Sequence, residues 1–277
     1  MRDFAGRRAV VTGAASGLGA AMVRAFADAG MSVLVADVNE AGARSVADAL
    51  SAGGRRAVAA RVDVGDAASL AALAATAESA LGGCDLLAAN VGVQRIGHTD
   101  ALTRDDWQWV IGVNVLGTVE TVRAFLPLLR RSGDAHVLFT GSMSSILSSP
   151  RLAAYTASKM AVLGYAETLR LELAPEGIGV TALLPAGMAT SHLDSSAAAR
   201  PAALGRSPDL TSEDVDAVVA VLASTPDAMI GPEHAIRDLL PALRENRPYV
   251  VTHVPNRPHV EARFRALLDA FDRAAEA

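Results

Sequence analysis

The sequence has few of the features that mark secreted, membrane-bound or nucleic-acid-binding proteins. Its 277 residues include a single cysteine, Cys84, so no intramolecular disulfide can form, which is typical of a reducing compartment. No window approaches 18 consecutive apolar residues free of charged residues and turn formers, which argues against a membrane-spanning helix. Lysine and arginine are scattered and the formal net charge is -5, so the basic clusters that bind nucleic acid or anionic membranes are missing. We therefore expect a cytoplasmic protein without nucleic-acid or membrane partners.

Metal-ligand clusters are also missing from the sequence. The six histidines lack ligand spacing on any one predicted element and have no cysteine or carboxylate cluster beside them, so we expect no metal. They are His98, His136, His192, His234, His253 and His259. Cys84 is expected to be a buried structural thiol, and Trp107 and Trp109 are expected to make packing or subunit contacts.

Short apolar runs alternate with longer segments of helical period over the first two thirds of the chain. With 51% hydrophobic and 20% charged residues, the chain can form a large packed core. Alternation of this kind predicts parallel βαβ units and an α/β, doubly wound sheet with helices on both faces. The predicted strands are residues 8–12, 32–36, 57–62, 86–89, 137–140 and 180–184. The predicted helices are residues 17–29, 40–50, 66–81, 105–131 and one that begins near residue 152.

The last third of the chain is less regular. No composition break or repeat divides the sequence, so we expect a single domain over residues 1–277. Residues 186–211 are small and polar without a sustained period, which predicts a loop that covers a site as a lid. Helices are expected at 211–224, 232–245 and 258–275, and a seventh strand at 249–252, within an atypical C-terminal extension over 232–277. The last helix has a narrow apolar stripe suited to docking on the body or on another subunit.

A glycine-rich turn follows the first predicted strand. Residues 12–19 read TGAASGLG and join a strand to a helix, the place where glycines let the backbone approach a pyrophosphate at a helix amino end. A glycine triplet alone is equally typical of a structural turn, but Asp37 ends the second strand, eighteen residues after Gly19, where a carboxylate can bind a ribose diol. The same carboxylate repels a 2′-phosphate, and no lysine or arginine lies in the loop or directly after Asp37. The sequence therefore predicts a dinucleotide site that prefers NAD to NADP.

Two polar residues follow the next strands. Asp63 comes after the third strand and Asn90 after the fourth, so both are expected at the same sheet edge as the glycine turn. Asn90 has two equally supported interpretations, contact with the cofactor and hydrogen bonding to adjacent backbone.

The segment from Ser142 to Lys159 carries the predicted chemistry. Tyr155 and Lys159 are four residues apart, so on a helix they share one face. A nearby ammonium favours the phenolate, and we therefore expect the pKa of Tyr155 to lie below its ordinary value of about 10. In an isolated Tyr-x-x-x-Lys pair, the tyrosine would more often be a packing residue and the lysine a solvated surface residue. The dinucleotide site predicted beside this pair makes a role in proton transfer the better interpretation.

Together these motifs resemble the short-chain dehydrogenase/reductase family over residues 8 to about 190. The resemblance rests on the 12–19 motif, Asp37, Asp63, Asn90, Asn114, Ser142 and the Tyr155-x-x-x-Lys159 pair. It implies a Rossmann-type sheet of about seven strands and a nicotinamide-dependent interconversion of alcohol and carbonyl groups. In this resemblance Ser142 polarises the substrate oxygen, Tyr155 exchanges its proton, Lys159 lowers the pKa of Tyr155 and binds the nicotinamide ribose, and Asn114 holds a proton-relay water.

The resemblance also assigns cofactor contacts. These are Gly13, Ser16, Gly17, Leu18, Gly19, Asp37, Asp63, Val64, Asn90, Gly92, Tyr155, Lys159, Pro185, Met188 and Thr190. The chain departs from the family pattern at Ala186, which replaces the glycine of a Pro-Gly pair, at Val91 in the Ala-Asn-Val-Gly run of residues 89–92, and in the C-terminal extension.

Substrate contacts are expected from Ser142, Gln94, Leu147, His192 and Leu193. For His192 the competing interpretation is an exposed loop histidine. The mostly apolar lid favours a lipophilic or weakly polar substrate, although its alanines and serines are equally compatible with a polyol. The alternatives to an NAD-dependent dehydrogenase are an NADPH-dependent biosynthetic ketoreductase and a non-catalytic dinucleotide-sensing regulator. The resemblance further implies a homotetramer or homodimer, with residues 105–131 and 152–174 at the subunit interface.

Overall fold

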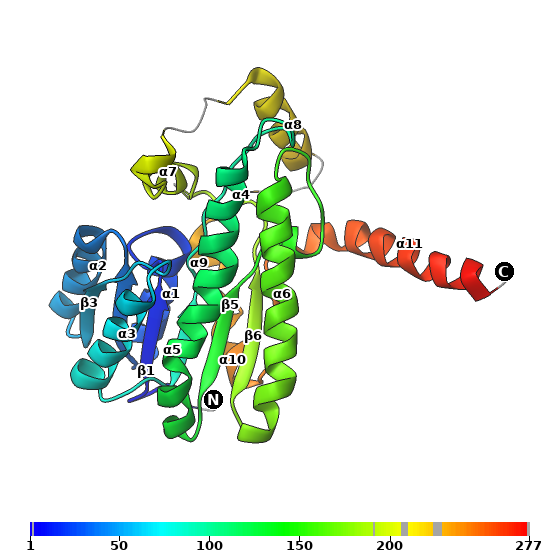
Figure 1. The fold of residues 1–277 in the computed structure, drawn as a ribbon. Helices are drawn as coiled ribbons and strands as arrows, with labels where there is room; N and C mark the ends of the chain where they lie inside the picture. Colours follow the sequence, from blue (N-terminus) through cyan, green and yellow to red (C-terminus); the bar gives the residue numbers. More distant parts are fainter. Residues whose placement is uncertain (2, 191, 206–209, 224–228, 276–277) are drawn as a thin grey trace.

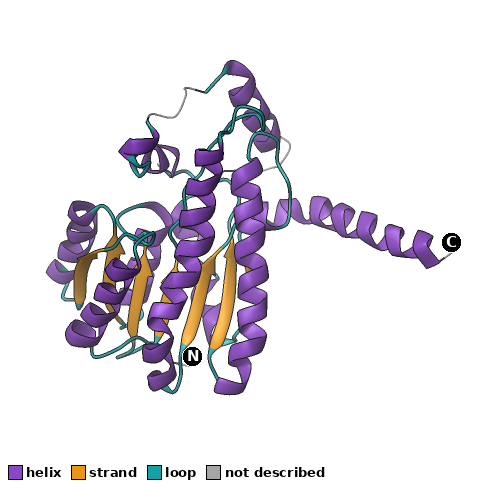
Figure 2. Cartoon of the chain, in the orientation of Figure 1, coloured by secondary structure: helices purple, strands orange, loops and turns teal. Residues whose placement is uncertain are grey.

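A parallel sheet of seven strands forms the centre of the molecule (Figures 1 and 2). The computed structural model describes residues 1–277 except residues 2, 191, 206–209, 224–228 and 276–277. The strand order is β3-β2-β1-β4-β5-β6-β7. The strands are β1 (Arg8–Thr12), β2 (Ser32–Asp37), β3 (Ala57–Arg61), β4 (Leu86–Ala89), β5 (His136–Thr140), β6 (Gly179–Leu184) and β7 (Tyr249–Val251). The predicted doubly wound sheet is confirmed.

Helices cover both faces of this sheet, which explains why the central strands are apolar along their whole length. On one face, α3, α5 and α6 pack Leu70, Phe125 and Val162 against the sheet. On the other face, α1 contributes Phe26 and α10 contributes Leu239. The helices before the lid are α1 (Gly17–Asp28), α2 (Glu40–Ala52), α3 (Ala67–Thr76), α4 (Arg104–Ile111), α5 (Gly117–Ser132) and α6 (Ala153–Leu173). The helices from the lid onward are α7 (His192–Ala198), α8 (Ser212–Ala223), α9 (Pro232–Ala235), α10 (Leu239–Arg244) and α11 (Arg257–Ala275).

The predicted helix over 105–131 is continuous but changes its winding in the middle. A π-helical turn, η2 (Gly112–Leu116), joins α4 to α5, and a second one, η1 (Ala77–Leu81), continues α3. By length and composition Arg104–Ser132 could cross a membrane, although 44% of its most apolar window is buried inside the protein. Its buried side chains, such as Phe125 and Leu129, pack against the sheet, so we interpret it as a core helix.

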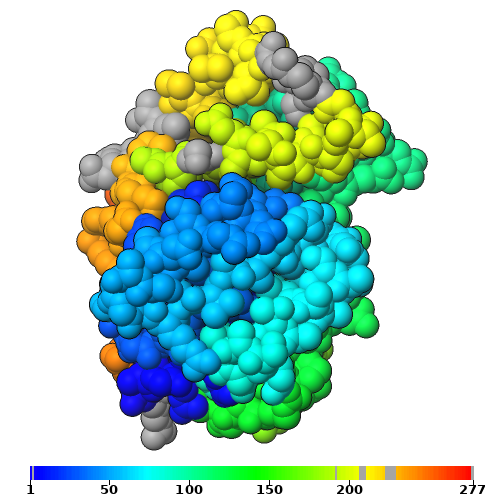
Figure 3. All heavy atoms as spheres, turned by 90° about the vertical axis from the view of Figure 1, so that its left-hand side faces the viewer, coloured from blue at the N-terminus to red at the C-terminus, as the bar shows by residue number. Residues whose placement is uncertain are grey.

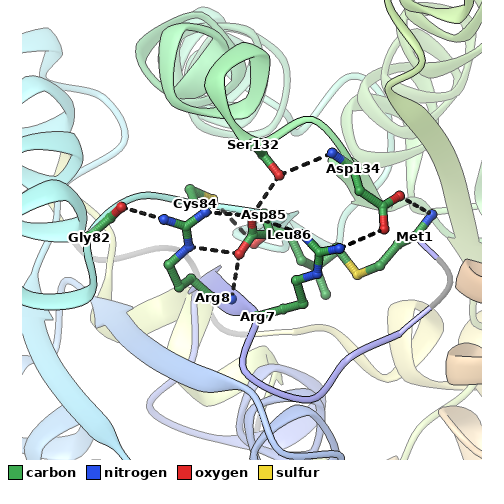
Figure 4. Close-up of polar contacts among 9 residues, drawn as sticks. All are labelled: Met1, Arg7, Arg8, Gly82, Cys84, Asp85, Leu86, Ser132 and Asp134. Atoms are coloured by element: carbon green, nitrogen blue, oxygen red, sulfur yellow. Dashed lines mark hydrogen bonds and ion pairs between the residues drawn. The ribbon is translucent and has the colours of Figure 1, made fainter.

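Charged side chains link the amino ends of β1 and β4 (Figure 4). These strand ends lie at the edge of the sheet opposite the glycine turn. Asp85 is 1% exposed and accepts hydrogen bonds from Arg8 Nε and Nη2, both at 2.7 Å, and from Ser132 Oγ at 2.6 Å. These bonds keep the pKa of Asp85 below its ordinary value although burial acts in the opposite direction. The neighbouring thiol of Cys84 is fully buried, as expected, and burial raises its pKa.

The lid is more ordered than the sequence suggests. Residues 186–211 were expected to lack regular structure, but they contain α7 and a 3-10 turn at Ala202–Leu204; residues 191 and 206–209 lie outside the described part. Figure 3 shows this segment and α8, in yellow-green and yellow, above the blue and cyan part of the body. The predicted 232–245 helix is two short helices, α9 and α10. The sequence pattern therefore predicted helix in this region but neither the break between α9 and α10 nor the helix within the lid, because packing rather than a long helical period stabilises such short helices.

Candidate active site

A cavity of about 910 Å³ lies at the carboxyl ends of the strands, under the lid. The strand order reverses between β1 and β4, and open α/β sheets bind ligands in the crevice at such a switch point. The cavity is lined by the glycine turn, by the residues that follow β2 to β6 and by the lid. The described residues contain no group of three His, Cys, Asp or Glu side chains that could hold a metal ion.

The glycine turn leaves room for backbone to approach a ligand. Gly13 and Gly17 have φ angles of +67° and +51°, which glycine adopts without strain. A Cβ atom on Gly19 would lie 2.1 Å from the carbonyl oxygen of Gly13, so this position excludes any side chain. Ser16 is the N-cap of α1 and its side chain makes no capping bond. The turn, including Leu18, therefore presents the amino end of a twelve-residue helix to the cavity, which suits a pyrophosphate.

The carboxylate of Asp37 borders the same cavity. One oxygen accepts a hydrogen bond from the amide of Ala15 at 3.0 Å, and the other accepts one from the amide of Asn39 at 2.9 Å. Each oxygen keeps a second lone pair that can accept a bond from a ribose hydroxyl. Lys159 is the single Lys or Arg among the described residues that line the cavity, and it belongs to the helix α6 rather than to the surroundings of Asp37.

Asp63 and Val64 line the cavity beyond β3. Asp63 is exposed and accepts a hydrogen bond from the amide of Gly65 at 2.9 Å, while Val64 is buried. The two residues can therefore offer a polar and an apolar contact to a base.

Asn90 forms hydrogen bonds that join β1, β4 and β5 at the switch point. Its Nδ2 donates to the carbonyl oxygens of Thr12 at 3.1 Å and Gly13 at 3.0 Å, and its Oδ1 accepts a bond from Thr140 Oγ1 at 2.9 Å. Both amide hydrogens are thereby used within the protein. Of the two interpretations open in the sequence, the geometry favours the structural one.

Tyr155 and Lys159 lie on one face of α6, as their spacing predicts. The Nζ of Lys159 is 5.7 Å from the centroid of the Tyr155 ring and donates a hydrogen bond to the carbonyl oxygen of Thr140 at 2.9 Å. Lys159 is 3% exposed, and burial lowers its pKa to about 8. A Cβ atom on Gly92 would lie 3.1 Å from this Nζ, so the glycine leaves space for the ammonium.

The pKa of Tyr155 moves in the opposite direction to the one predicted. Burial raises it, and the interaction with the hydroxyl of Ser142 lowers it by a smaller amount. Burial disfavours the phenolate, and the ammonium of Lys159 is directed at Thr140 instead of the phenol oxygen. In the protein alone, Tyr155 is therefore held as a protonated phenol.

Ser142 stands at the end of β5 as the N-cap of a 3-10 turn. Its Oγ accepts a hydrogen bond from the amide of Ser144 at 3.1 Å, and its own amide donates to Ser145 Oγ at 3.1 Å. The amide of Met143 donates to the carbonyl oxygen of Pro185 at 2.6 Å, which ties this turn to the end of β6. The hydroxyl of Ser142 is thus fixed beside Tyr155, as the sequence predicts.

Asn114 is fully buried in the π-helical turn. Its Oδ1 accepts a bond from the amide of Val93 at 2.7 Å, and its Nδ2 donates to the carbonyl oxygen of Val93 at 2.8 Å and to Ser158 Oγ at 2.9 Å. The side chain therefore joins the loop after β4 to Ser158 in α6. Widened helical turns of this kind often occur at functional sites.

The lid places His192 beside Tyr155. The two ring centroids are 6.3 Å apart, and His192 is half-buried, so the interpretation as an exposed loop residue is wrong. Burial, and then the charge of Lys159, lowers the pKa of His192 to about 4 and keeps the imidazole neutral. Ser196, one turn further along α7, donates to the carbonyl oxygen of His192 at 2.7 Å and accepts from the amide of Gln94 at 3.2 Å.

The remaining predicted contacts also border the cavity. Gln94, Leu147, Leu193, Pro185, Met188 and Thr190 all line it. Thr190 lies against the glycine turn, since a Cβ atom on Gly17 would be 3.3 Å from its methyl group. Sequence reasoning missed further lining residues from outside the motifs, which no local pattern distinguishes from core or surface residues. They are Ile96, Leu152, Val218, Val221, Met229 and Asn256.

A buried ion pair holds the lid to the body. Arg200 donates to Asp106 in α4 at 2.6 Å, and the two side chains are 7% and 2% exposed. The guanidinium carbon of Arg200 lies 5.3 Å from the centroid of the Trp109 ring, which makes this tryptophan the packing residue expected from the sequence. Arg200 also donates to the carbonyl oxygen of Gly205 at 2.9 Å, so it organises the lid turn as well.

Comparison with known proteins gives one consistent family. The family described as short chain dehydrogenase matches residues 7–201. A curated relative from Sphingobium sp. strain SYK-6, a C alpha-dehydrogenase, is 30% identical over 273 residues, which cover 98% of this chain and 88% of the relative. A 2,5-dichloro-2,5-cyclohexadiene-1,4-diol dehydrogenase from Sphingobium indicum is 33% identical over 68% of this chain and 75% of its own length. The crystal structure of a short chain dehydrogenase/reductase from Burkholderia phymatum in complex with NAD superposes with a TM-score of 0.89 and is 34% identical, covering 96% of each chain.

Proposed function

Since this chain belongs to the short-chain dehydrogenase family of oxidoreductases, we propose that it is an NAD-dependent enzyme that interconverts a secondary alcohol and a ketone. The observation that carries the proposal is the convergence of Asp37, Ser142, Tyr155 and Lys159 on one cavity at the switch point of the sheet. The similar structure from B. phymatum, which was solved with NAD, supports the choice of cofactor class.

The cavity fits a dinucleotide. The amino end of α1 and the glycine turn would hold the pyrophosphate, Asp37 the adenosine ribose, and Asp63 and Val64 the adenine. Lys159 would reach the nicotinamide ribose, and Pro185, Met188 and Thr190 would bind the nicotinamide end. When bound, the dinucleotide accepts the hydride from the alcohol or delivers it to the ketone.

Tyr155 is the proton-exchanging group in this proposal. In the reductive direction its phenol, which burial keeps protonated, donates to the substrate oxygen, and in the oxidative direction the phenolate takes the hydroxyl proton. Lys159 stabilises that phenolate through its positive charge, and the hydroxyl of Ser142 polarises the substrate oxygen. Asn114 keeps Val93 and Ser158 in place around them and would hold the water that passes on the proton.

Replacement of Tyr155 tests the mechanism. We expect Tyr155→Phe to reduce kcat by about 10²- to 10⁴-fold, the usual contribution of a positioned acid or base, with little change in the affinity for NADH. The measurement is NADH formation, followed by absorbance, across a panel of secondary alcohols. Undiminished activity of the variant on any alcohol that the wild type oxidises would refute the role of Tyr155.

Cofactor preference depends on Asp37. We expect a higher kcat/KM with NAD than with NADP at matched concentrations, because the carboxylate repels a 2′-phosphate and no arginine or lysine lines this end of the cavity among the described residues. Asp37→Ser should reduce the ratio of kcat/KM with NAD to kcat/KM with NADP. Asp63→Ser, also at the adenosine end of the cavity, should leave this ratio nearly unchanged. Equal or better use of NADP by the wild type would favour the alternative, an NADPH-dependent ketoreductase.

The substrate end of the cavity supports an uncharged, largely apolar alcohol. The lid contributes Leu193, the segment after the lid contributes Val218 and Met229, and no Asp, Glu, Lys or Arg other than Lys159 lines this end among the described residues. Gln94, Ser144 and His192 are among the uncharged hydrogen-bonding groups that line the cavity. A carboxylated or phosphorylated substrate would find no paired charge there.

A non-catalytic sensor of dinucleotides is the alternative from another class. Such a sensor would need the cofactor site, but it would not need Ser142, Tyr155 and Lys159 to lie together. Because these three side chains line the same cavity, the structure supports an enzyme. We further propose a homodimer or homotetramer that packs α6 and the continuous helix over residues 104–132 against a partner; Leu171 of α6 is 77% exposed, and Leu116, in the π-helical turn, is 60% exposed. A monomer in light scattering would refute that assembly.

A further inference from the structure

The last helix, α11, projects away from the body of its own chain (Figure 1). None of its described residues is buried. Arg263 donates a hydrogen bond to the carbonyl oxygen of Ile146 and so ties the first turns of the helix to the loop after β5. Beyond this tie, the apolar side of this 19-residue helix has no counterpart on the same chain among the described residues.

Four large apolar residues form a stripe along α11. Phe264, Leu267, Leu268 and Phe271 recur at spacings of three and four residues and are 51%, 50%, 58% and 74% exposed. Most of the stability of a helix in a protein comes from packing of such a face rather than from helix propensity. Of the two expected places for the stripe, the body of its own chain does not cover it, which leaves another subunit or another molecule.

The charges of α11 argue against a membrane or nucleic acid as that molecule. The helix carries four arginines and no lysine, and three acidic residues offset them. Helices that lie on anionic membranes have a strongly basic polar face, which this helix lacks. The mixed charges of α11 are better suited to a protein surface that carries both positive and negative charges than to a membrane or nucleic acid.

The distribution of these charges matches a second copy of the same helix. Arg265 lies in the first half and Asp272 in the second, seven residues later, so they share one flank of the apolar stripe. Neither residue has an ion pair among the described residues of its own chain. When two copies of α11 run antiparallel and cross between Leu267 and Leu268, Phe264 faces Phe271 of the second copy. In the same register Arg265 lies within about one helical turn of Asp272 of the second copy, and the two-fold axis creates this pair twice.

We propose that α11 is an intersubunit clamp: its apolar stripe packs antiparallel against the stripe of α11 in a second copy of this chain. The contact is isologous and closes on itself, so it joins two chains and does not extend into a fibre. One helix offers less than the roughly 800 Å² per partner of a stable specific interface. The clamp therefore adds to another contact between the two copies.

Introduced cysteines test the pairing and its direction. Cys84 is buried, so a single new cysteine can be oxidised without interference. Leu267→Cys, beside the crossing point, should form an interchain disulfide in the full-length protein, whereas Asp269→Cys, on the opposite face, is the matched control and should not. Phe264→Cys and Phe271→Cys should cross-link when the two variants are mixed and not when each is oxidised alone. No more disulfide from Leu267→Cys than from Asp269→Cys would overturn the proposal, and cross-linking of Phe264→Cys alone would replace the antiparallel arrangement with a parallel one.

Charge reversal provides a second, independent measurement. Arg265→Glu and Asp272→Arg should each weaken self-association in sedimentation equilibrium by about 2- to 30-fold, the range for two exposed ion pairs, and the double variant should restore it. Thermal unfolding should be unchanged, because both residues are exposed. Equal weakening in the double variant, or sedimentation of the wild type with vesicles of anionic lipid, would show that α11 has a different partner.

Discussion

His136, the first residue of β5, should make the protein lose stability in mild acid. The side chain is fully buried, and its Nε2 lies 2.9 Å from the hydroxyl of Thr181. That hydroxyl donates its own proton to the carbonyl oxygen of Arg247 at 2.6 Å, so Nε2 of His136 must be the donor and Nδ1 carries the lone pair. Nδ1 has no hydrogen-bond partner, and a proton added there would be a buried, unpaired charge.

The size of the loss follows from linkage between protonation and folding. Burial lowers the pKa of His136 to about 3, below the ordinary value of about 6.5 that applies in the unfolded chain. The contribution of the neutral form is therefore complete above pH 6.5 and is lost as the pH falls from 6.5 towards 3. Each pH unit within this window costs about 1.36 kcal/mol, so His136 alone should lower the free energy of unfolding by about 2 kcal/mol between pH 7.5 and pH 5.

Replacement of His136 by glutamine isolates this contribution. Glutamine can donate to Thr181 from a similar position but does not titrate. Urea unfolding at pH 7.5, 6.5, 5.5 and 5.0 should show that His136→Gln loses about 2 kcal/mol less than the wild type. His259→Gln, at an exposed position of α11, is the control and should follow the wild type. If His136→Gln loses as much stability as the wild type over this range, the assignment of a neutral buried imidazole is wrong.

Three further outcomes follow from the site and its supports. Gly19→Ala should weaken NADH binding measured by fluorescence at least tenfold, because its Cβ atom would meet the carbonyl oxygen of Gly13, whereas Gly164→Ala, with open space around it, should leave binding unchanged. Arg200→Leu should lower the free energy of unfolding in urea by about 1.5–3 kcal/mol, since it removes the hydrogen bond from Arg200 to the buried carboxylate of Asp106 while Arg95, at 3.9 Å, and Thr103 remain; a loss below about 1 kcal/mol would contradict a buried pair. Lys159→Met should abolish activity yet raise the melting temperature at pH 7, because the fold holds this ammonium in a site that lowers its pKa to about 8; a lower melting temperature would count against that cost.

The sheet and its order of elements were predictable because parallel strands that are covered on both faces need continuous apolar runs. The segments around Val10 and Leu87 show such runs and have no exposed residues. The position of Tyr155 and Lys159 on one helix face was predictable for a related reason, since their i, i+4 spacing fixes a shared face regardless of the tertiary context.

Properties that depend on tertiary surroundings were not predictable from local pattern. The direction of the Tyr155 pKa depends on burial by the lid and on where Lys159 points, and neither is encoded in the spacing of the two residues. The position of His192 depends on a short helix that is stabilised by contacts such as that between Ser196 and Gln94, far apart in the sequence. Asn256 reaches the cavity from the C-terminal extension through the overall fold alone.

Thr140 connects the glycine turn to Lys159. Its hydroxyl donates to Asn90, which in turn holds the carbonyl oxygens of Thr12 and Gly13, and its own carbonyl oxygen accepts the ammonium of Lys159. A displacement of the glycine turn would therefore reach Lys159 through two side chains, and in the proposed mechanism Lys159 stabilises the phenolate of Tyr155. Changes at Thr140 should alter the KM for the cofactor and kcat together, so cofactor affinity and turnover cannot be tuned separately by substitutions at this position.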